Sequence, residues 1–213
     1  MKAWDDSWKT EEGRARWLYP DPFIVSYLPK LKKEGIEKVL DLGSGVGRHT
    51  ILFAKEGFDV YGVDPSPSGF KYTLKWFERE RLPPKLILSE MSQLPFIDDF
   101  FDLIVAWNVI YHGTAKVIHK TVNEIVRCLR HNGYLLYTLI STKHNKFGNG
   151  KEIEKNTYII KEEKEKSHPH HYFNEEEINR FFKGFTHLRC VDKEQFYPGL
   201  FHWHLLSRLV AKH

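Results

Sequence analysis

The feature that most constrains this chain is a glycine-rich stretch at residues 39–56. A short apolar run with Asp41 near its end leads into three glycines at alternate positions, Gly43, Gly45 and Gly47, and residues 50–55 have helical apolar spacing. This order predicts a strand, a tight turn and a helix. Open α/β sheets bind nucleotide-like ligands where such a loop joins a strand end to a helix N-terminus. The stretch therefore predicts a site of that kind.

A second acid narrows the choice of ligand. Residues 57–64 predict a second strand with Asp64 at its tip. Asp64 follows the glycine turn by about 20 residues, the spacing that places a carboxylate on ribose hydroxyl groups. The dinucleotide fingerprint has its third glycine where this chain has Arg48, and Arg48 therefore argues against NAD.

Four motifs in order resemble the class I S-adenosylmethionine-dependent methyltransferases. The acid and alternate glycines of residues 41–47 resemble the first motif of that family, and Asp64 resembles the acid that closes its second strand. Residues 89–96 and 100–108 resemble its adenine-binding turn and fourth strand. The resemblance covers residues 36–140, and the order of later elements extends it to the C-terminus.

The resemblance implies an α/β fold, a three-layer α/β/α sandwich with a Rossmann-like sheet. Seven mostly parallel strands and an antiparallel last strand are expected. Periodicity places strands at 38–42, 59–63, 85–88, 102–106, 134–140, 186–194 and 202–210. We expect one methyltransferase domain over 1–213, with residues 1–35 as a helical cover and 141–173 as an insertion that serves as a substrate lid or as a solvated surface.

S-adenosylmethionine is the cofactor that the resemblance implies. Asp41 would help to orient its ammonium group, Asp64 would hold the ribose, and Glu90 would accept a bond from the adenine amino group. Many relatives have Asp-Ala where this chain has Glu90 and Met91, so a solvated loop carboxylate is the alternative for Glu90. The other expected cofactor positions are Gly43, Ser44, Gly45, Gly47, Pro65, Ser66, Met91, Ser92, Trp107 and Asn108.

The expected catalytic residue is His112, at the C-terminal end of the fourth strand. A histidine titrates near neutrality and is able to orient or deprotonate a nucleophile, although a packing role is the alternative. Tyr19, Arg48 and His171 are further candidates for the acceptor side, and Arg48 would equally fit a surface ion pair. N-terminal segments often cover the cofactor in the family that the chain resembles, which makes Trp17 and Tyr19 candidates for that cover, with packing against the core edge as the alternative.

Twelve histidines also raise the question of a metal. Residues 168–171 hold three of them, and alternation puts His202 and His204 on one face of a strand. No cysteine joins either cluster and no His-Glu-x-x-His pattern is present. We therefore expect no metal ion and interpret these histidines as substrate-side, surface or packing residues.

Composition limits the class of protein to which this chain can belong. With 213 residues, 41% hydrophobic and 15% aromatic, the chain suits one folded domain. A net charge of +4 is compatible with nucleic acid without favouring it. Cys128 and Cys190 have apolar neighbours, which predicts buried free thiols in a reducing cytoplasm. No apolar stretch reaches the roughly 20 residues that span a bilayer, and no membrane association is expected.

The expected activity is methyl transfer to a small molecule by a monomer or homodimer. Residues 47–60 and 171–177 are similar to methyltransferases of the tellurite-resistance and thiol-methylating type. A nucleic-acid methyltransferase would place the lysines of residues 143–155 against phosphate, but no Asn-Pro-Pro-Tyr motif follows the fourth strand. A cofactor-binding module without catalysis is the other alternative.

Overall fold

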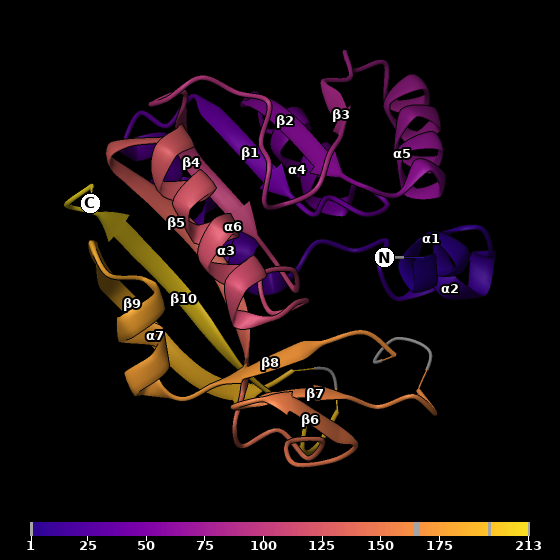
Figure 1. Cartoon of the computed structure of the whole chain (residues 1–213). Helices are drawn as coiled ribbons and strands as arrows, with labels where there is room; N and C mark the ends of the chain where they lie inside the picture. The colour runs from indigo at the N-terminus through magenta and orange to yellow at the C-terminus, as the bar shows by residue number, and fades with distance from the viewer. Residues whose placement is uncertain (1, 164–166, 196, 213) are drawn as a thin grey trace.

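The computed structural model describes residues 2–163, 167–195 and 197–212 (Figure 1). Its helices are α1 (Lys2–Trp8), α2 (Glu11–Ala15), α3 (Pro22–Lys33), α4 (Arg48–Lys55), α5 (Pro67–Glu80), α6 (Ala115–Cys128) and α7 (Glu175–Phe181). Its strands are β1 (Lys38–Leu42), β2 (Asp59–Asp64), β3 (Leu86–Leu88), β4 (Phe101–Ala106), β5 (Leu129–Ser141), β6 (Lys151–Glu154), β7 (Thr157–Ile159), β8 (His170–Phe173), β9 (Phe185–Glu194) and β10 (Phe201–Leu209).

The main sheet has the expected topology. Strands β3, β2, β1, β4 and β5 lie side by side in that order and run parallel, β10 pairs antiparallel with β5, and β9 pairs with β10. The antiparallel last strand is therefore confirmed. The register pairs Leu42 with Val63, so the C-terminal ends of β1 and β2 lie next to each other. The loops that leave these ends form one edge of the sheet.

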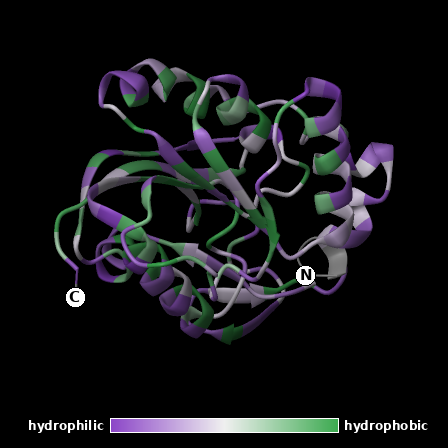
Figure 2. Cartoon of the chain, turned by 90° about the horizontal axis from the view of Figure 1, so that it is seen from above, coloured by the Kyte–Doolittle hydropathy of each residue, from purple (hydrophilic) through white to green (hydrophobic). Residues whose placement is uncertain are grey.

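Alternate residues of the central strands pack on opposite faces, which produces the three layers. In β4, Leu103 and Val105 pack with α3 and α4, whereas Ile104 and Ala106 pack in the cluster that includes α6 and α7. Both faces of β4 are buried from Leu103 to Ala106, and this explains the continuous apolar run of these four residues. Figure 2 shows the same arrangement as hydrophobic strands through the middle and hydrophilic patches on the surrounding helices.

Capping side chains stabilise the N-termini of α3 and α5, which lie near the loops at the C-terminal ends of β1 and β2. Asp21 accepts a bond from the N–H of Phe23 at 2.9 Å at the start of α3, and Ser66 accepts one from Gly69 at 3.0 Å at the start of α5. A proline occupies the first position of both helices, where its missing N–H costs nothing. These caps fix the points at which α3 and α5 begin.

The insertion contains a small sheet that the sequence did not indicate. Strands β6 and β7 form a hairpin through Asn156, whose φ of +61° suits a two-residue turn. Strand β8 pairs antiparallel with β7 and parallel with the end of β5. Because the residues of β6 are charged and mostly exposed, they lack the alternating apolar pattern that identifies a strand.

The structure differs from the sequence-based expectation at Cys190 and at the start of β5. Cys128 is buried and free as expected, but Cys190 is exposed, and its predicted burial is wrong. Among the described residues β9 pairs only with β10, so Cys190 lies on an edge strand with little cover. Strand β5 also begins five residues earlier than 134, at Leu129.

None of the described helices combines the length and apolar character needed to cross a membrane.

Candidate functional site

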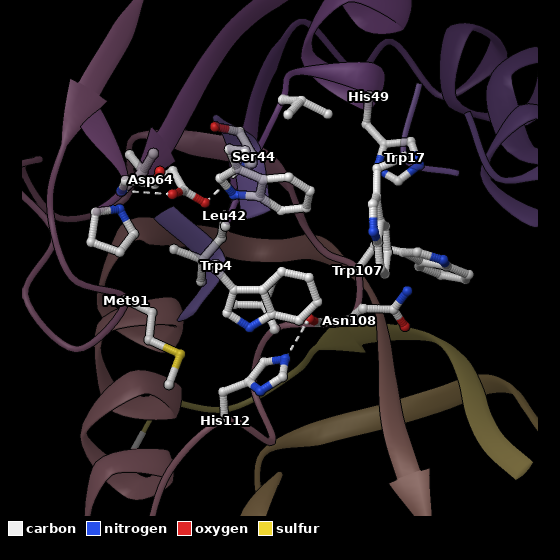
Figure 3. Close-up of a pocket in the computed structure, with 18 of the residues that line it drawn as sticks. Trp4, Trp17, Leu42, Ser44, His49, Asp64, Met91, Trp107, Asn108 and His112 are labelled. Carbon is white, nitrogen blue, oxygen red and sulfur yellow. Dashed lines mark hydrogen bonds between the residues drawn. The ribbon is translucent and has the colours of Figure 1, made fainter. Parts of the chain in front are cut away.

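A pocket lies at the C-terminal ends of β1, β2 and β4, where sequence reasoning placed a ligand (Figure 3). Its wall contains the glycine loop, the tip of β2, the turn after β3 and the end of β4. Its lining residues are Trp4, Trp8, Trp17, Leu42, Gly43, Ser44, Gly45, Val46, Arg48, His49, Val63, Asp64, Pro65, Ser66, Ser89, Met91, Trp107, Asn108, Val109 and His112.

The glycine loop can adopt its path only with glycine. Gly43, Gly45 and Gly47 all have positive φ, at +71°, +55° and +85°. A Cβ on Gly43 would lie 2.2 Å from a methyl carbon of Val109. A Cβ on Gly47 would lie 2.3 Å from Thr73, so Gly47 allows α5 to pack closely and does not line the pocket.

Asp64 holds the loop and faces the pocket. Its Oδ2 accepts a hydrogen bond from the N–H of Gly45 at 2.9 Å, and its Oδ1 accepts one from the N–H of Ser66 at 2.8 Å. Burial raises the pKa of the Asp64 carboxyl group to about 6 despite these donors. Pro65 and Ser66 line the pocket beside it. A carboxylate at this place is able to accept bonds from two neighbouring hydroxyl groups of a ligand.

Asp41 lies beneath the loop. Its side chain is buried, accepts a bond from the hydroxyl group of Thr50 at 2.6 Å, and does not line the pocket. Burial raises the pKa of the Asp41 carboxyl group to about 6, and the nearby Arg48 guanidinium opposes this shift. The structure therefore places Asp41 where it supports the end of β1 and the start of α4.

Three tryptophans from the N-terminal segment close the opposite side of the pocket. The ring of Trp4 stacks on Trp8 with centroids 5.2 Å apart, and Trp17 meets both rings edge-on at 5.5 and 6.0 Å. Figure 3 shows Trp4 beside His112 and opposite Asp64. Only Trp17 of these three was a sequence-based candidate. The spacing of Trp4 and Trp8, which puts both on one helical face, was the signal that would have identified them.

One aspartate fastens α1 to the wall of the pocket. Asp5 Oδ1 accepts hydrogen bonds from the Ser66 hydroxyl group at 2.7 Å and the Ser68 N–H at 2.9 Å. The backbone bond from Ser68 is the main reason why the pKa of Asp5 falls to about 2. Because Ser66 belongs to the pocket, α1 and the site are directly connected.

We expect Asp5→Ala to weaken binding of a pocket ligand by roughly fivefold, since charge-assisted bonds of a partly exposed group contribute about 1 kcal/mol. Asp6→Ala is the matched control, because Asp6 is the adjacent residue and both acids contact Lys9. Calorimetric titration of the two variants with S-adenosylhomocysteine measures the difference. Equal affinities for the two variants would contradict the fastening role of Asp5.

The end of β4 supplies two hydrogen-bond donors. Asn108 has a φ of +62°, its N–H donates to the Thr138 hydroxyl group at 2.8 Å, and that hydroxyl group donates to Asn108 Oδ1 at 3.0 Å. Asn108 Nδ2 and Trp107 Nε1 are buried and have no partner within the described parts of the chain. Since unsatisfied buried donors are rare, both suit a bound ligand.

The turn after β3 is only partly in the wall. Met91 and Ser89 line the pocket, whereas Glu90 is exposed and Ser92 lies outside the lining.

His49 of α4 also lines the pocket, although the sequence did not indicate it. It is buried, and its Nε2 accepts a bond from the N–H of Asp21 at 3.1 Å. Burial lowers the pKa of His49 well below its usual value, which keeps this ring neutral.

A second cavity adjoins the first and shares Trp4, Trp17, Asn108 and His112 with it. Its other lining residues come from the end of α2, the insertion, the ends of β4 and β5, the β9–β10 turn and the start of β10. They are Arg16, Tyr111, Ile140, His144, Lys146, Glu163, His170, Gln195, Leu200 and His202. The shared residues make His112 part of both cavities, as a group between a cofactor and an acceptor would be.

The remaining acceptor-side candidates are placed differently. Arg48 is buried in the first pocket, with its guanidinium 5.1 Å from the Trp17 ring, and donates to the carbonyl of Tyr19 at 3.3 Å. The side chain of Tyr19 itself is 77% exposed. His171 is buried outside both cavities, where its Nδ1 lies 2.7 Å from the Thr157 hydroxyl group and its pKa is lowered by burial.

The chain is similar in sequence to known methyltransferases. A family model described as a methyltransferase domain matches residues 39–133. A methyltransferase-named protein of Geobacillus sp. strain WCH70 is 25% identical over 140 residues, which are 65% of this chain and 56% of that protein. The chain therefore spans about half the length of the curated relatives that it matches.

Solved structures share the fold. A S-adenosylmethionine-dependent methyltransferase from Methanosarcina mazei has a TM-score of 0.76 at 19% identity, covering 92% of this chain and 100% of its own. A Burkholderia thailandensis 1,6-didemethyltoxoflavin-N1-methyltransferase with bound 1,6-didemethyltoxoflavin and S-adenosylhomocysteine has a TM-score of 0.70 at 19% identity, covering 99% and 88%. TehB from Haemophilus influenzae has a TM-score of 0.66 at 18% identity, covering 86% and 61%.

Proposed function

Because the chain belongs to the class I S-adenosylmethionine-dependent methyltransferases, we propose that it transfers a methyl group from S-adenosylmethionine to a small-molecule acceptor. The observation that carries this proposal is the contact between the two cavities. The first contains the glycine loop and Asp64, and the second meets it at Asn108 and His112. Two compounds bound side by side would react across this boundary.

The residues of the first pocket fit the cofactor. Asp64 would accept bonds from the ribose hydroxyl groups, and the backbone of Gly43 and Gly45 would leave room for the methionine part. Met91 would contact the adenine. The donors Trp107 Nε1 and Asn108 Nδ2, which have no partner within the described residues, would bond to acceptor atoms of the bound molecules. Asp41 would act through the loop, since it lies below the pocket.

When bound, the cofactor supplies a sulfonium group that already activates the methyl group for in-line attack. The chain has to orient the acceptor and exclude water. The tryptophans of residues 4–17 would exclude water from the first pocket. The Nε2–H of His112 donates to the Asn108 carbonyl oxygen at 3.0 Å, and this bond assigns the basic lone pair to Nδ1. His112 would orient the nucleophilic atom of the acceptor at the boundary between the two cavities.

The second cavity supports a small polar acceptor. Its wall combines histidines with Tyr111 and carries charges of both signs, with Glu163 paired to Lys146. Lys143 pairs with Asp192 at 3.1 Å. Two of the lysines that a nucleic-acid substrate would use are therefore already in ion pairs, which disfavours that alternative.

The proposal is tested first by calorimetric titration with S-adenosylmethionine, S-adenosylhomocysteine and NAD. We expect micromolar binding of the first two and none of NAD. Formation of S-adenosylhomocysteine is then measured with thiol, amine, hydroxyl and metalloid acceptors. Binding without turnover of any acceptor would favour a non-catalytic module, and turnover of RNA with steep salt dependence would favour a nucleic-acid enzyme.

Two further expectations belong to the proposal. We propose that residues 1–213 act as one domain, because the N-terminal segment and the insertion both contribute to the cavities. We also propose a cytoplasmic location, because Cys128 and Cys190 are free thiols, which is compatible with a reducing compartment.

A further inference from the structure

Three histidines from separate parts of the chain meet at the boundary between the two cavities. His112 follows β4, His168 precedes β8 and His170 begins it. One ring nitrogen from each lies within 4.8 Å of the other two, and His112 Nδ1 is 3.0 Å from His168 Nε2. Nitrogens bound to one tetrahedral Zn²⁺ are about 3.4 Å apart, so small ring rotations would suffice to bring the three onto one ion.

Backbone carbonyls orient two of these rings. His112 Nε2–H donates to the Asn108 oxygen at 3.0 Å, and His170 Nδ1–H donates to the His168 oxygen at 2.9 Å. Each bond assigns the proton to one nitrogen and the lone pair to the other, His112 Nδ1 and His170 Nε2. Metal-binding histidines almost always have such a bond on the far nitrogen.

Ring packing also limits the motion of His112. Its ring lies 4.5 Å from Tyr111 and meets Trp4 edge-on at 5.8 Å, as centroid distances. Figure 3 shows Trp4 directly beside the His112 ring and the bond from that ring to Asn108. A ligand held in this way has less conformational freedom to lose when a metal ion binds, which favours binding.

We propose that His112, His168 and His170 form a three-histidine site for a divalent transition-metal ion, with Zn²⁺ as the best match. Imidazole nitrogen is a preferred ligand of Zn²⁺, and three protein ligands with one remaining position are typical of a site that binds a reactant. His112 and His170 line the second cavity. The remaining position would therefore take a thiol, hydroxyl or nitrogen group of the acceptor, which binds through its lone pair and releases its proton to solvent. This step rests on the proposed function.

The other clustered histidines do not join this site. The alternation of β8 puts His171 on the opposite side from His170, against Thr157 and, at 3.6 Å, Glu177. His202 and His204 each place Nδ1 3.1 Å from a carbonyl oxygen two residues earlier, and His204 packs on Phe23 and Trp107. The sequence did not indicate this site, because His112 lies 56 residues before His168 and only histidines close in sequence were compared.

The test uses the full-length protein without a polyhistidine tag, stripped with a chelator and titrated with Zn²⁺ against a chromophoric chelator. We expect one ion per chain and at least a tenfold loss of affinity in His168→Ala and in His170→Ala. His202→Gln is the control, because it lines the same cavity but lies outside the trio, and its affinity should be unchanged. Absence of stoichiometric binding, or equal affinity in all variants, would overturn the site.

Substitution with Co²⁺ separates this inference from the proposed function. We expect visible absorption of a tetrahedral Co²⁺ centre, and a new thiolate charge-transfer band when a small thiol is added. Both should disappear in His170→Ala. If the chain bound metal but not S-adenosylmethionine, the metal site would stand and the proposed function would be overturned. If it bound the cofactor but showed no Co²⁺ absorption, the proposed function would stand and the metal site would be overturned.

Discussion

Replacement of Asp64 by alanine should lower the affinity for S-adenosylmethionine by at least 100-fold. The variant would lose the proposed bonds to the ribose hydroxyl groups and also the two bonds that hold Gly45 and Ser66 in place. Hydrogen bonds to a charged group contribute about 1.5–3 kcal/mol each, so losing two of them is sufficient for such a change. Calorimetric titration measures it directly.

The matched control is Asp59→Ala, at the other end of β2, where the carboxylate pairs with Lys85 on the surface. Surface pairs of this kind contribute little, so Asp59→Ala should bind like the parent chain. Asp64→Asn retains one acceptor oxygen and should bind with intermediate affinity. Unchanged binding by Asp64→Ala would refute the ribose assignment.

The same carboxyl group should give cofactor binding a pH dependence. Since burial raises the pKa of Asp64 to about 6 in the ligand-free protein, the group is ionised at pH 8 and largely protonated at pH 5. Only the ionised form accepts bonds with all its lone pairs. We expect affinity to fall below about pH 6 in the parent chain and to change much less in Asp64→Asn. A flat profile in the parent chain would contradict this prediction.

The sequence predicted the strand–turn–helix unit that borders the first pocket, because its signals are local. The strand, the alternate glycines and the acid at the next strand tip lie within 26 residues, from Val39 to Asp64. Each of these signals depends on backbone geometry that neighbouring residues determine. The terminal antiparallel pair, β9 and β10, was also predicted, because each strand is long.

The cover of the pocket was harder to predict, because its position depends on contacts between distant residues. Trp4 and Trp8 reach the pocket because Asp5 bonds to Ser66, which is 61 residues away. The sequence predicted a helical cover at residues 1–35 but not the residues that it contacts. Tyr19 was a candidate because it lies in the aromatic N-terminal segment, yet its side chain is exposed. Its contact with Arg48 uses the Tyr19 carbonyl group.

The buried carboxylate of Asp41 lowers the free energy of unfolding when it is ionised. Its folded-state pKa of about 6 lies above the ordinary value of 3.8, so the folded chain binds this proton more tightly than the unfolded chain does. The sign follows from linkage: the ionised group destabilises the fold, and the destabilisation grows as the pH rises from about 4 to about 6 and is complete above that range. Each pKa unit corresponds to about 1.4 kcal/mol.

We therefore expect Asp41→Asn to stabilise the chain more at pH 8 than at pH 4.5, with a difference of about 1–2 kcal/mol in the free energy of unfolding. Asparagine keeps an oxygen that accepts the bond from Thr50 but removes the buried charge. Asp99→Asn is the control, because Asp99 is an exposed acid that pairs with Lys212. Urea unfolding at both pH values gives the comparison. If Asp41→Asn destabilised the chain equally at both, the carboxylate would be a net contributor to the fold, and the unfavourable burial of its charge would be refuted.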